Sequence, residues 1–254
     1  MRSNGSPGAE AFNRRARDYV RRNEQGIIML SFHSDPSIKS NYLARVAGHA
    51  DADEIVKGRY WENGKGCAVG CTIHGEAHES FERELGIPRM LAWLEDVIFE
   101  GLPNRFAKTW PERFLSSIVP GRDLSPVGWE FLHWLLTESG LGEFDHALTK
   151  AAVARCADTL APLIDRRPVD VSAAKHAATA ARTAMDTVSR IDGLPDAVAW
   201  SAESAALAAE SAALSGTDLT VSAERAVTAT SAAIAGSKDY IRMSEKLLEL
   251  LEAA

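Results

Sequence analysis

The chain is short of cysteine, of long apolar runs and of basic charge, and each shortage excludes a class of protein. Its 254 residues include only 3 cysteines, whose spacing matches no disulfide framework, so a reducing compartment is expected. No run approaches the roughly 20 apolar residues of a membrane span, and the N-terminus lacks the apolar core of a signal peptide. The formal net charge of -7 argues against a general nucleic-acid binder, which needs a basic face to neutralise phosphates. A cytoplasmic protein is therefore expected.

Apolar residues in this chain rarely alternate with polar ones, which argues against a β-rich fold. They recur instead at helical spacing, as at Phe12, Ala16 and Val20, and the hydrophobic content of 46% is enough for a real core. We therefore predict an all-α protein, in which a globular helical domain is followed by an Ala/Ser-rich helical hairpin or bundle.

Composition divides the chain into three parts. Residues 1–8 are small, polar and glycine-rich, and they predict a disordered leader. Residues 9–167 predict the globular helical domain, and residues 168–254 the Ala/Ser-rich helical segment. Helices in the globular part are predicted over 9–24, 36–49, 79–85, 88–101, 111–119, 125–139 and 142–164.

Several helix ends in the globular part carry specific signals. Asp35 can cap a helix whose first residue is Pro36, because its carboxylate can accept a bond from a free backbone N–H group there. Gly86 is typical of a left-handed helix end, and Pro88 of the start of the next helix. Asn63 and Gly64 predict a turn.

The Ala/Ser-rich segment contains a seven-residue repeat, AESAALA at 202–208 and AESAALS at 209–215. This period places Trp200, Leu207, Leu214 and Val221 on one seam, which indicates helix-on-helix packing. Glycine breaks allow the segment to fold back as a hairpin bundle, and a longer rod is the alternative. Because a bundle could leave the seam uncovered, we predict a homodimer through the C-terminal helices.

Residues 64–85 concentrate the groups most suited to chemistry. If residues 67–74 are helical, Cys67 and Cys71 lie one turn apart on one face, and His74 and His78 share the same spacing of four. Two thiolates and two imidazoles are ligands that zinc prefers, so the four residues predict a zinc site. The cysteine spacing is C-x3-C, however, which differs from the C-x2-C of most zinc knuckles.

A second hypothesis makes Cys67 a catalytic nucleophile. At the start of a helix and close to Lys65, its thiol would have a lowered pKa. The loop of Lys65, Gly66 and Cys67 could also bind an anionic small ligand, although it is not a Walker A loop. The candidate bases for this thiol are His33, His49, His74 and His78.

A third interpretation is structural. The small residues Cys67, Ala68, Gly70 and Cys71 would let a short helix pack tightly, and free cysteine is often buried. Cys156 in an alanine-rich helix is expected to be structural, and the tryptophans at 93, 110, 129 and 134 are expected in the core. Glu95 and Asp96 diverge by about 100° on a helix, so they predict a solvated face or local salt bridges rather than a catalytic pair.

The block GKGCAVGCTIHG, with His78, ELGIP at 84–88 and LEDVIFEGLPN at 94–104, resembles a family of bacterial and bacteriophage proteins that has no established activity. The resemblance covers about residues 31–140, and the tail only in composition; it implies a bacterial or phage cytosolic setting. The predicted function is a small-ligand or metal site in the Cys/His block, for a small molecule or protein partner. The alternative is a non-enzymatic assembly protein that acts through its Ala-rich helices.

Overall fold

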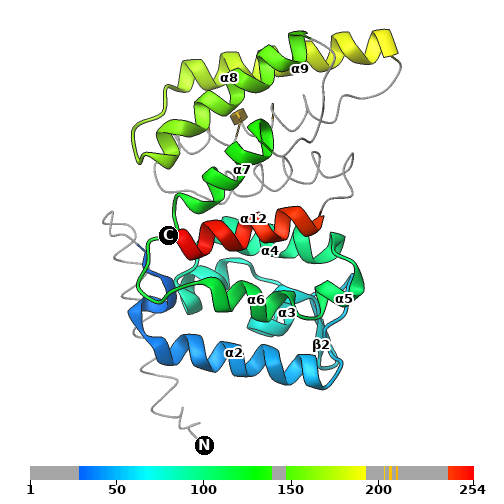
Figure 1. Ribbon diagram of the computed structural model, residues 1–254, viewed down its shortest axis with the longest axis vertical. Helices are drawn as coiled ribbons and strands as arrows, with labels where there is room; N and C mark the ends of the chain where they lie inside the picture. Colours follow the sequence, from blue (N-terminus) through cyan, green and yellow to red (C-terminus); the bar gives the residue numbers. More distant parts are fainter. Residues whose placement is uncertain (1–28, 139–146, 193–202, 204–205, 208–209, 211–239) are drawn as a thin grey trace, which may run out of the picture.

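The computed structural model describes residues 29–138, 147–192, 203, 206, 207, 210 and 240–254 (Figure 1). In this part of the chain the protein is all-α, which confirms the predicted fold class. The elements in chain order are η1 (Ser31–Ser34), α2 (Pro36–Asp51), β1 (Trp61–Glu62), β2 (Lys65–Gly66), α3 (Ala68–Ile73), η2 (Phe81–Leu85), α4 (Arg89–Gly101), α5 (Asn104–Ala107), α6 (Trp110–Ser117), α7 (Val127–Thr137), α8 (Ala147–Ile164), α9 (Val171–Asp192) and α12 (Tyr240–Ala253). No helix in the described ranges combines the length and the apolar character that a membrane crossing requires.

The capping signals act as the sequence predicts. Asp35 caps α2, and its carboxylate accepts a hydrogen bond of 2.9 Å from the backbone N–H of Ser37. Gly86 ends η2 in the left-handed conformation, with a φ of 62°, and Pro88 stands directly before α4. Within α2, Tyr42 and Val46 are buried, whereas Ala44 is exposed.

The turn predicted at Asn63 and Gly64 joins β1 and β2 into a small antiparallel hairpin. Both turn residues have positive φ values, 52° and 81°, as a type I′ hairpin turn requires. The segment before the hairpin pairs with it, since Val56 donates to the carbonyl of Gly66 (2.8 Å). The strands are two residues long, so the fold class is unchanged.

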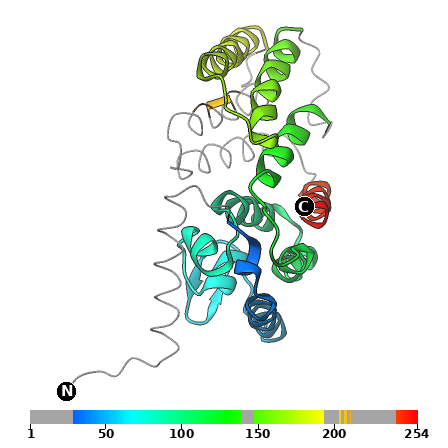
Figure 2. The same ribbon diagram turned by 90° about the vertical axis from the view of Figure 1, so that its left-hand side faces the viewer.

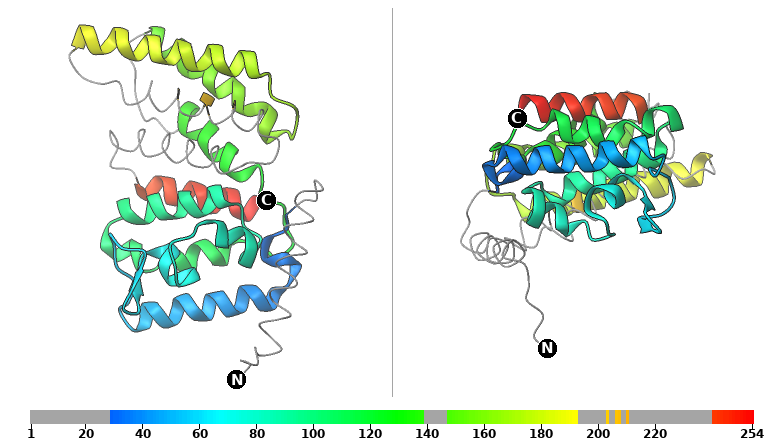
Figure 3. Two further views of the ribbon diagram at one scale, coloured as in Figure 1. Left: turned by 180° about the vertical axis from the view of Figure 1, so that it is seen from behind. Right: turned by 90° about the horizontal axis from the view of Figure 1, so that it is seen from below.

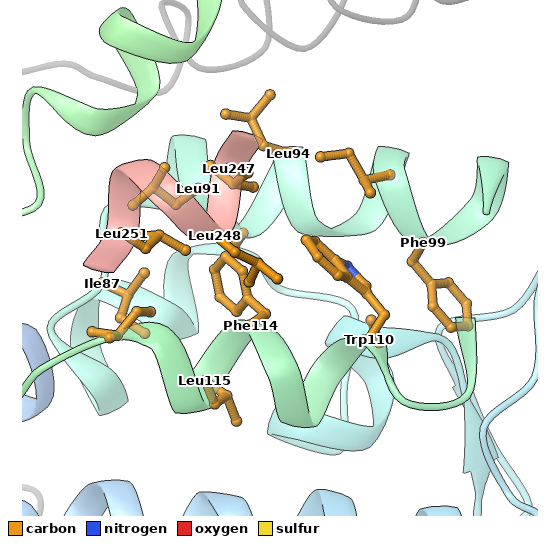
Figure 4. Close-up of a cluster of buried hydrophobic side chains, with 14 of the residues drawn as sticks. Ile87, Leu91, Leu94, Phe99, Trp110, Phe114, Leu115, Leu247, Leu248 and Leu251 are labelled. Carbon is orange, nitrogen blue, oxygen red and sulfur yellow. The ribbon is translucent and has the colours of Figure 1, made fainter. Parts of the chain in front are cut away.

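Helix α4 is the central helix of the main core. It lies against α3, α6, α7 and α12, so other helices cover most of its circumference. Figure 4 shows Leu91 and Leu94 of α4 among side chains from α6 and α12. A helix covered in this way has little surface left for solvated side chains. Its buried residues are Met90, Leu91, Ala92, Leu94, Glu95, Asp96, Ile98 and Phe99.

The last helix, α12, returns to this core, although residues 168–254 were predicted as one Ala/Ser-rich unit. It packs against α4, α6 and α7 (Figures 1 and 4). Met243, Leu247, Leu248 and Leu251 are buried in the same hydrophobic cluster as Phe114. The physical reason is side-chain size: a stripe of leucines buries far more apolar area than a stripe of alanines, and the main core offers that area.

Helices α8 and α9 pack together at the opposite end of the molecule from α2 (Figures 2 and 3). This contact joins the two sides of the predicted boundary at residue 167. The small cluster between them contains Ala152, Val153, Cys156, Ala177, Ala178, Ala181, Ala184 and Ala206, and Leu207 packs partly against it. Cys156 is fully buried and its Sγ lies 3.5 Å from the carbonyl of Ala177, which fits the predicted structural role.

Several predictions concern residues outside the described part of the chain. The leader at 1–8, the helix at 9–24 and the seam residues Trp200, Leu214 and Val221 belong to this group. Of the predicted seam only Leu207 is described, and it contacts the α8–α9 cluster of its own chain. The homodimer and the choice between bundle and rod stay predictions.

Candidate functional site

Cys67 stands at the start of helix α3 rather than inside it. Its Sγ accepts a hydrogen bond of 3.4 Å from the backbone N–H of Gly70, so the side chain caps the helix. The helix ends at Ile73, and His74 follows in the left-handed conformation with a φ of 52°. The predicted helix over 67–74 is therefore shorter at both ends, and His74 leaves the face that carries the two cysteines.

Glycine is required where α3 meets the hairpin. A Cβ atom on Gly70 would lie 1.3 Å from the backbone oxygen of Tyr60, and one on Gly66 would lie 2.0 Å from the same atom. No side chain fits at either distance. The residues at 68–72 of α3 are all buried. This close packing supports the structural interpretation for part of the Gly/Cys block.

The thiols of the block are buried and free. Burial raises the pKa of Cys67, and the carboxyls of Asp96 and Glu95 raise it further, while the N–H of Gly70 acts in the opposite direction. Burial likewise raises the pKa of Cys71 to about 12. Lys65, which was expected to favour the thiolate, is exposed and its charge acts on Asp53. The surroundings of Cys67 thus favour the neutral thiol.

We expect iodoacetamide to label Cys67 in the folded protein at pH 7 as slowly as it labels Cys156. The thiolate is the reactive form, and a raised pKa keeps its fraction very small at this pH. Because the thiolate fraction grows tenfold per pH unit below the pKa, labelling should accelerate as the pH rises. Mass spectrometry of peptides after timed labelling measures the rates, and the denatured chain is the control. Much faster labelling of Cys67 than of Cys156 at pH 7 would restore the nucleophile hypothesis.

A cluster of polar side chains lies beside Cys67, between the hairpin and α4. We call Tyr60, Cys67, His78, Glu95 and Asp96 the buried polar cluster. The His78 Nε2 atom is 3.6 Å from Oδ2 of Asp96. The ring of Tyr60 meets the His78 imidazole edge-on, with centroids 5.5 Å apart. The imidazole is thereby held beside a carboxyl group.

Trp93 completes the wall around His78. The two rings are stacked with centroids 3.6 Å apart and an angle of 8° between their planes. Trp93 is only partly buried, whereas Trp110, Trp129 and Trp134 lie in the core as predicted. Trp93 and Tyr60 are therefore the side chains of this region that reach toward solvent.

The segment before the hairpin is anchored to the end of α4, and this anchor positions Tyr60. Lys57 Nζ donates to the carbonyls of Glu100 (3.0 Å) and Leu102. The backbone N–H of Gly58 donates to the Glu100 carboxylate at 3.0 Å. Helix α4 thus carries the two acids of the cluster, and its C-terminal end also anchors the segment that contains Tyr60.

Part of the buried polar cluster lacks hydrogen-bond partners. Glu95 is fully buried, and burial, followed by the charge of Asp96, raises its pKa well above the usual value. Within the described part of the chain, four buried atoms here have no hydrogen-bond partner: Nε2 of His78, both carboxyl oxygens of Glu95 and Oδ1 of Asp96. Such atoms are rare in folded proteins, and a functional role or an unseen partner commonly accounts for them.

The prediction of a solvated face for Glu95 and Asp96 is wrong. That interpretation treated the helix as two-sided, with one face in water, but α4 is surrounded by other helices. His78 does pair with Asp96, so the local salt bridge was predicted in part. One signal was available in the sequence: the two acids are the only charged residues in the run MLAWLEDVIF at 90–99.

A second cluster lies on the other side of the hairpin. His49 Nδ1 is 2.6 Å from Oε2 of Glu54, and His49 Nε2 is 2.8 Å from Nε2 of His74. Trp61 stacks on His74 with ring centroids 4.3 Å apart. We call Glu54, His49, His74 and Trp61 the histidine pair cluster. Partial burial, then the charges of Arg45 and His49, lower the pKa of His74.

The structure divides the predicted zinc ligands between these places. Cys67 and His78 lie by Asp96, His74 lies by His49, and the Sγ of Cys71 is 3.3 Å from the carbonyl of Gly66. Across the ranges that the structure describes, no three His, Cys, Asp or Glu side chains are close enough together to hold a metal ion. Cys67, Cys71, His74 and His78 therefore do not share one centre here.

The residues of the predicted small-ligand loop differ in exposure, and the candidate bases lie in different parts of the structure. Gly66 and Cys67 are buried while Lys65 is exposed. His33 lies 3.1 Å from the carbonyl of Arg83, which is a different neighbourhood. Of the four candidate bases, His78 is the one placed next to Asp96, the carboxyl that acts on Cys67.

No protein-family model, curated protein or solved structure matches this chain. The resemblance to a bacterial and phage family thus stays a prediction. The chemistry of the two clusters is what bears on function.

Proposed function

We propose that this protein binds a small molecule bearing an amine or a similar hydrogen-bond donor at the buried polar cluster, where His78 and Asp96 form an acid–base pair. The observation that carries the proposal is the set of four buried polar atoms without hydrogen-bond partners on His78, Glu95 and Asp96. Leaving such an atom unpaired costs about 1–3 kcal/mol, so a fold that keeps four of them together gains by binding a partner for them.

The two carboxyl groups are the main acceptors of the cluster. They bring four oxygen atoms, and the donors beside them are the O–H of Tyr60, the S–H of Cys67 and, because burial raises its pKa, the O–H of a protonated Glu95. Burial, followed by the carboxyl of Asp96, raises the pKa values of both Tyr60 and Cys67, so these two groups stay protonated. A ligand with N–H donors supplies hydrogen bonds to the carboxyl oxygens that have no partner.

His78 is held in the manner of a general acid–base residue. Stacking on Trp93 fixes the plane of its ring, and Asp96 lies 3.6 Å from Nε2. A carboxyl group at this position orients an imidazole. The pair can therefore exchange a proton with a bound amine.

The three free, buried cysteines fit a reducing compartment, and we propose that the protein is cytoplasmic.

The test is a thermal-shift series with small amines and guanidines, including methylammonium, guanidinium and free amino acids. We expect at least one of them to raise the Tm of the protein saturably, since a ligand at a hundredfold excess over Kd stabilises the fold by about 2.7 kcal/mol. In Asp96→Asn, which keeps the side-chain shape, the increase should be lost.

Asp158→Asn is the matched control, because Asp158 is exposed on α8 far along the chain from the cluster. This variant should respond to the ligand as the unaltered protein does. The proposal fails if no compound in the series raises the Tm at millimolar concentration, or if Asp96→Asn keeps the full response.

A further inference from the structure

The histidine pair cluster has a geometry that the proposed function does not use. The two imidazoles point their Nε2 atoms at each other, 2.8 Å apart, and both rings border Trp61. Glu54 holds the far side of His49 through Nδ1 at 2.6 Å. His49 is partly buried and His74 is exposed, so the pair is accessible from solvent.

We propose that His49 and His74 together bind a divalent transition-metal ion through their Nε2 atoms, with Glu54 as the carboxylate that orients His49. Histidine ligands of metals almost always donate their second ring N–H group to a carboxylate, a carbonyl or a water. Glu54 occupies that position for His49. The proposal concerns residues other than those of the buried polar cluster and is independent of it.

The separation of the two nitrogen atoms is close to that of a chelate. Imidazole nitrogens lie about 2.0–2.1 Å from zinc, so two of them on one tetrahedral ion are about 3.3 Å apart. The observed 2.8 Å is a hydrogen-bond distance, and an opening of about 0.5 Å converts it to the ligand distance. A bound metal ion thus takes the place of the proton that the two Nε2 atoms share, and the two rings already face each other in the orientation that the ion needs.

The supporting structure holds both histidines in place. The backbone N–H of Glu54 donates to the carbonyl of His49 at 2.9 Å, which fixes the carboxylate near the end of α2. His74 is fixed by its place as the cap of α3 and by stacking on Trp61. A rigid pair of ligands loses little entropy on binding, which favours affinity.

The charges near the pair are mixed. Arg45 is the nearby cation, and its guanidinium donates to the carbonyl of Thr72 at 2.7 Å. The carboxylates of Glu54 and Glu84 act on His74 with the opposite sign. In the described part of the chain no third Cys, His, Asp or Glu side chain joins the pair. Two protein ligands leave the other two positions of a four-coordinate ion to water or to another ligand, so the site has one protein ligand fewer than a catalytic zinc site.

The test is calorimetric titration of the full chain, freed of metal by a chelator, with Zn²⁺ and separately with Cu²⁺. We expect one ion per chain. His49→Ala and His74→Asn should each weaken the affinity at least tenfold, and asparagine at 74 tolerates the left-handed backbone there, so that variant keeps the fold. Glu54→Gln should weaken the affinity about tenfold, as loss of an outer-shell carboxylate commonly does.

Control variants separate this site from other histidines and thiols. His176→Ala changes an exposed histidine on α9 and should bind as the unaltered chain does. Cys71→Ser removes a ligand of the four-residue site suggested by sequence, and binding should persist. In Trp61→Phe, binding should remain while Cu²⁺ quenches less of the tryptophan fluorescence, because Trp61 touches His74. Absence of saturable binding, or binding that survives both His49→Ala and His74→Asn, overturns the proposal, as does loss of binding in Cys71→Ser alone.

Discussion

Replacing Gly70 by alanine is expected to lower the free energy of unfolding by about 3 kcal/mol, the upper part of the usual range for an overpacked core. The added methyl group would lie 1.3 Å from the backbone oxygen of Tyr60, so α3 and the hairpin must move apart. That movement also disturbs Tyr60 and Cys67, and with them the buried polar cluster. Urea denaturation followed by circular dichroism measures the change.

Gly48→Ala is the matched control for this substitution. Gly48 also lies in a helix, α2, but a Cβ atom there would meet no other atom within 4 Å. Alanine is the better helix former by about 1 kcal/mol, so Gly48→Ala should leave the stability unchanged or raise it. If both variants lost stability to the same extent, close approach to Tyr60 would not be the cause.

Truncating Leu247 to alanine is expected to destabilise the whole main core, by about 2–5 kcal/mol. Leu247 is fully buried on α12, and Figure 4 shows it beside Leu91 of α4. Because α12 shares its core with α6, the substitution should lower the Tm reported by fluorescence of the core tryptophans as well as that reported by circular dichroism. Ile241→Ala on the same helix, where the side chain is 37% exposed, is the control and should cost less than 1 kcal/mol.

The outcome of the Leu247 experiment decides whether α12 belongs to the first half of the protein. If the Tm reported by tryptophan fluorescence stays unchanged while circular dichroism shows that some helix melts earlier, then α12 contacts the core without contributing to its stability. If the two transitions move together, a chain ending at Arg167 loses part of its core as well as its tail. Self-association through the predicted seam is then tested better by light scattering of the full chain with polar substitutions at Leu214 and Val221.

The two clusters share the short segment that contains Tyr60 and Trp61. Tyr60 contacts His78, while the next residue, Trp61, contacts His74 and His49. Side chains of consecutive residues in extended chain point to opposite sides, which explains how one hairpin serves two places. His74 and His78, four residues apart, contact these two different side chains and do not meet.

The sequence by itself determined the features that depend on a few neighbouring residues. The all-α class, the cap at Asp35, the left-handed Gly86 and the turn at Asn63 and Gly64 follow from backbone geometry and local hydrogen bonds. Such signals need no knowledge of distant parts of the chain. The Cys/His block was also recognised from the sequence as the place where polar side chains gather. His74 belongs to the histidine pair cluster, and Cys67 and His78 belong to the buried polar cluster.

Only the tertiary structure decided which of these groups meet and which are buried. Glu95 and Asp96 are charged residues on a helix, and nothing within the helix shows that α3, α6, α7 and α12 surround it. The partner of His74 is His49, 25 residues earlier, and the partner of His78 is Asp96, 18 residues later. The leucines of α12 join a core that reaches back in the sequence to Phe32. Burial and charge pairing depend on what covers a side chain, and that is set by long-range packing of apolar area rather than by local sequence.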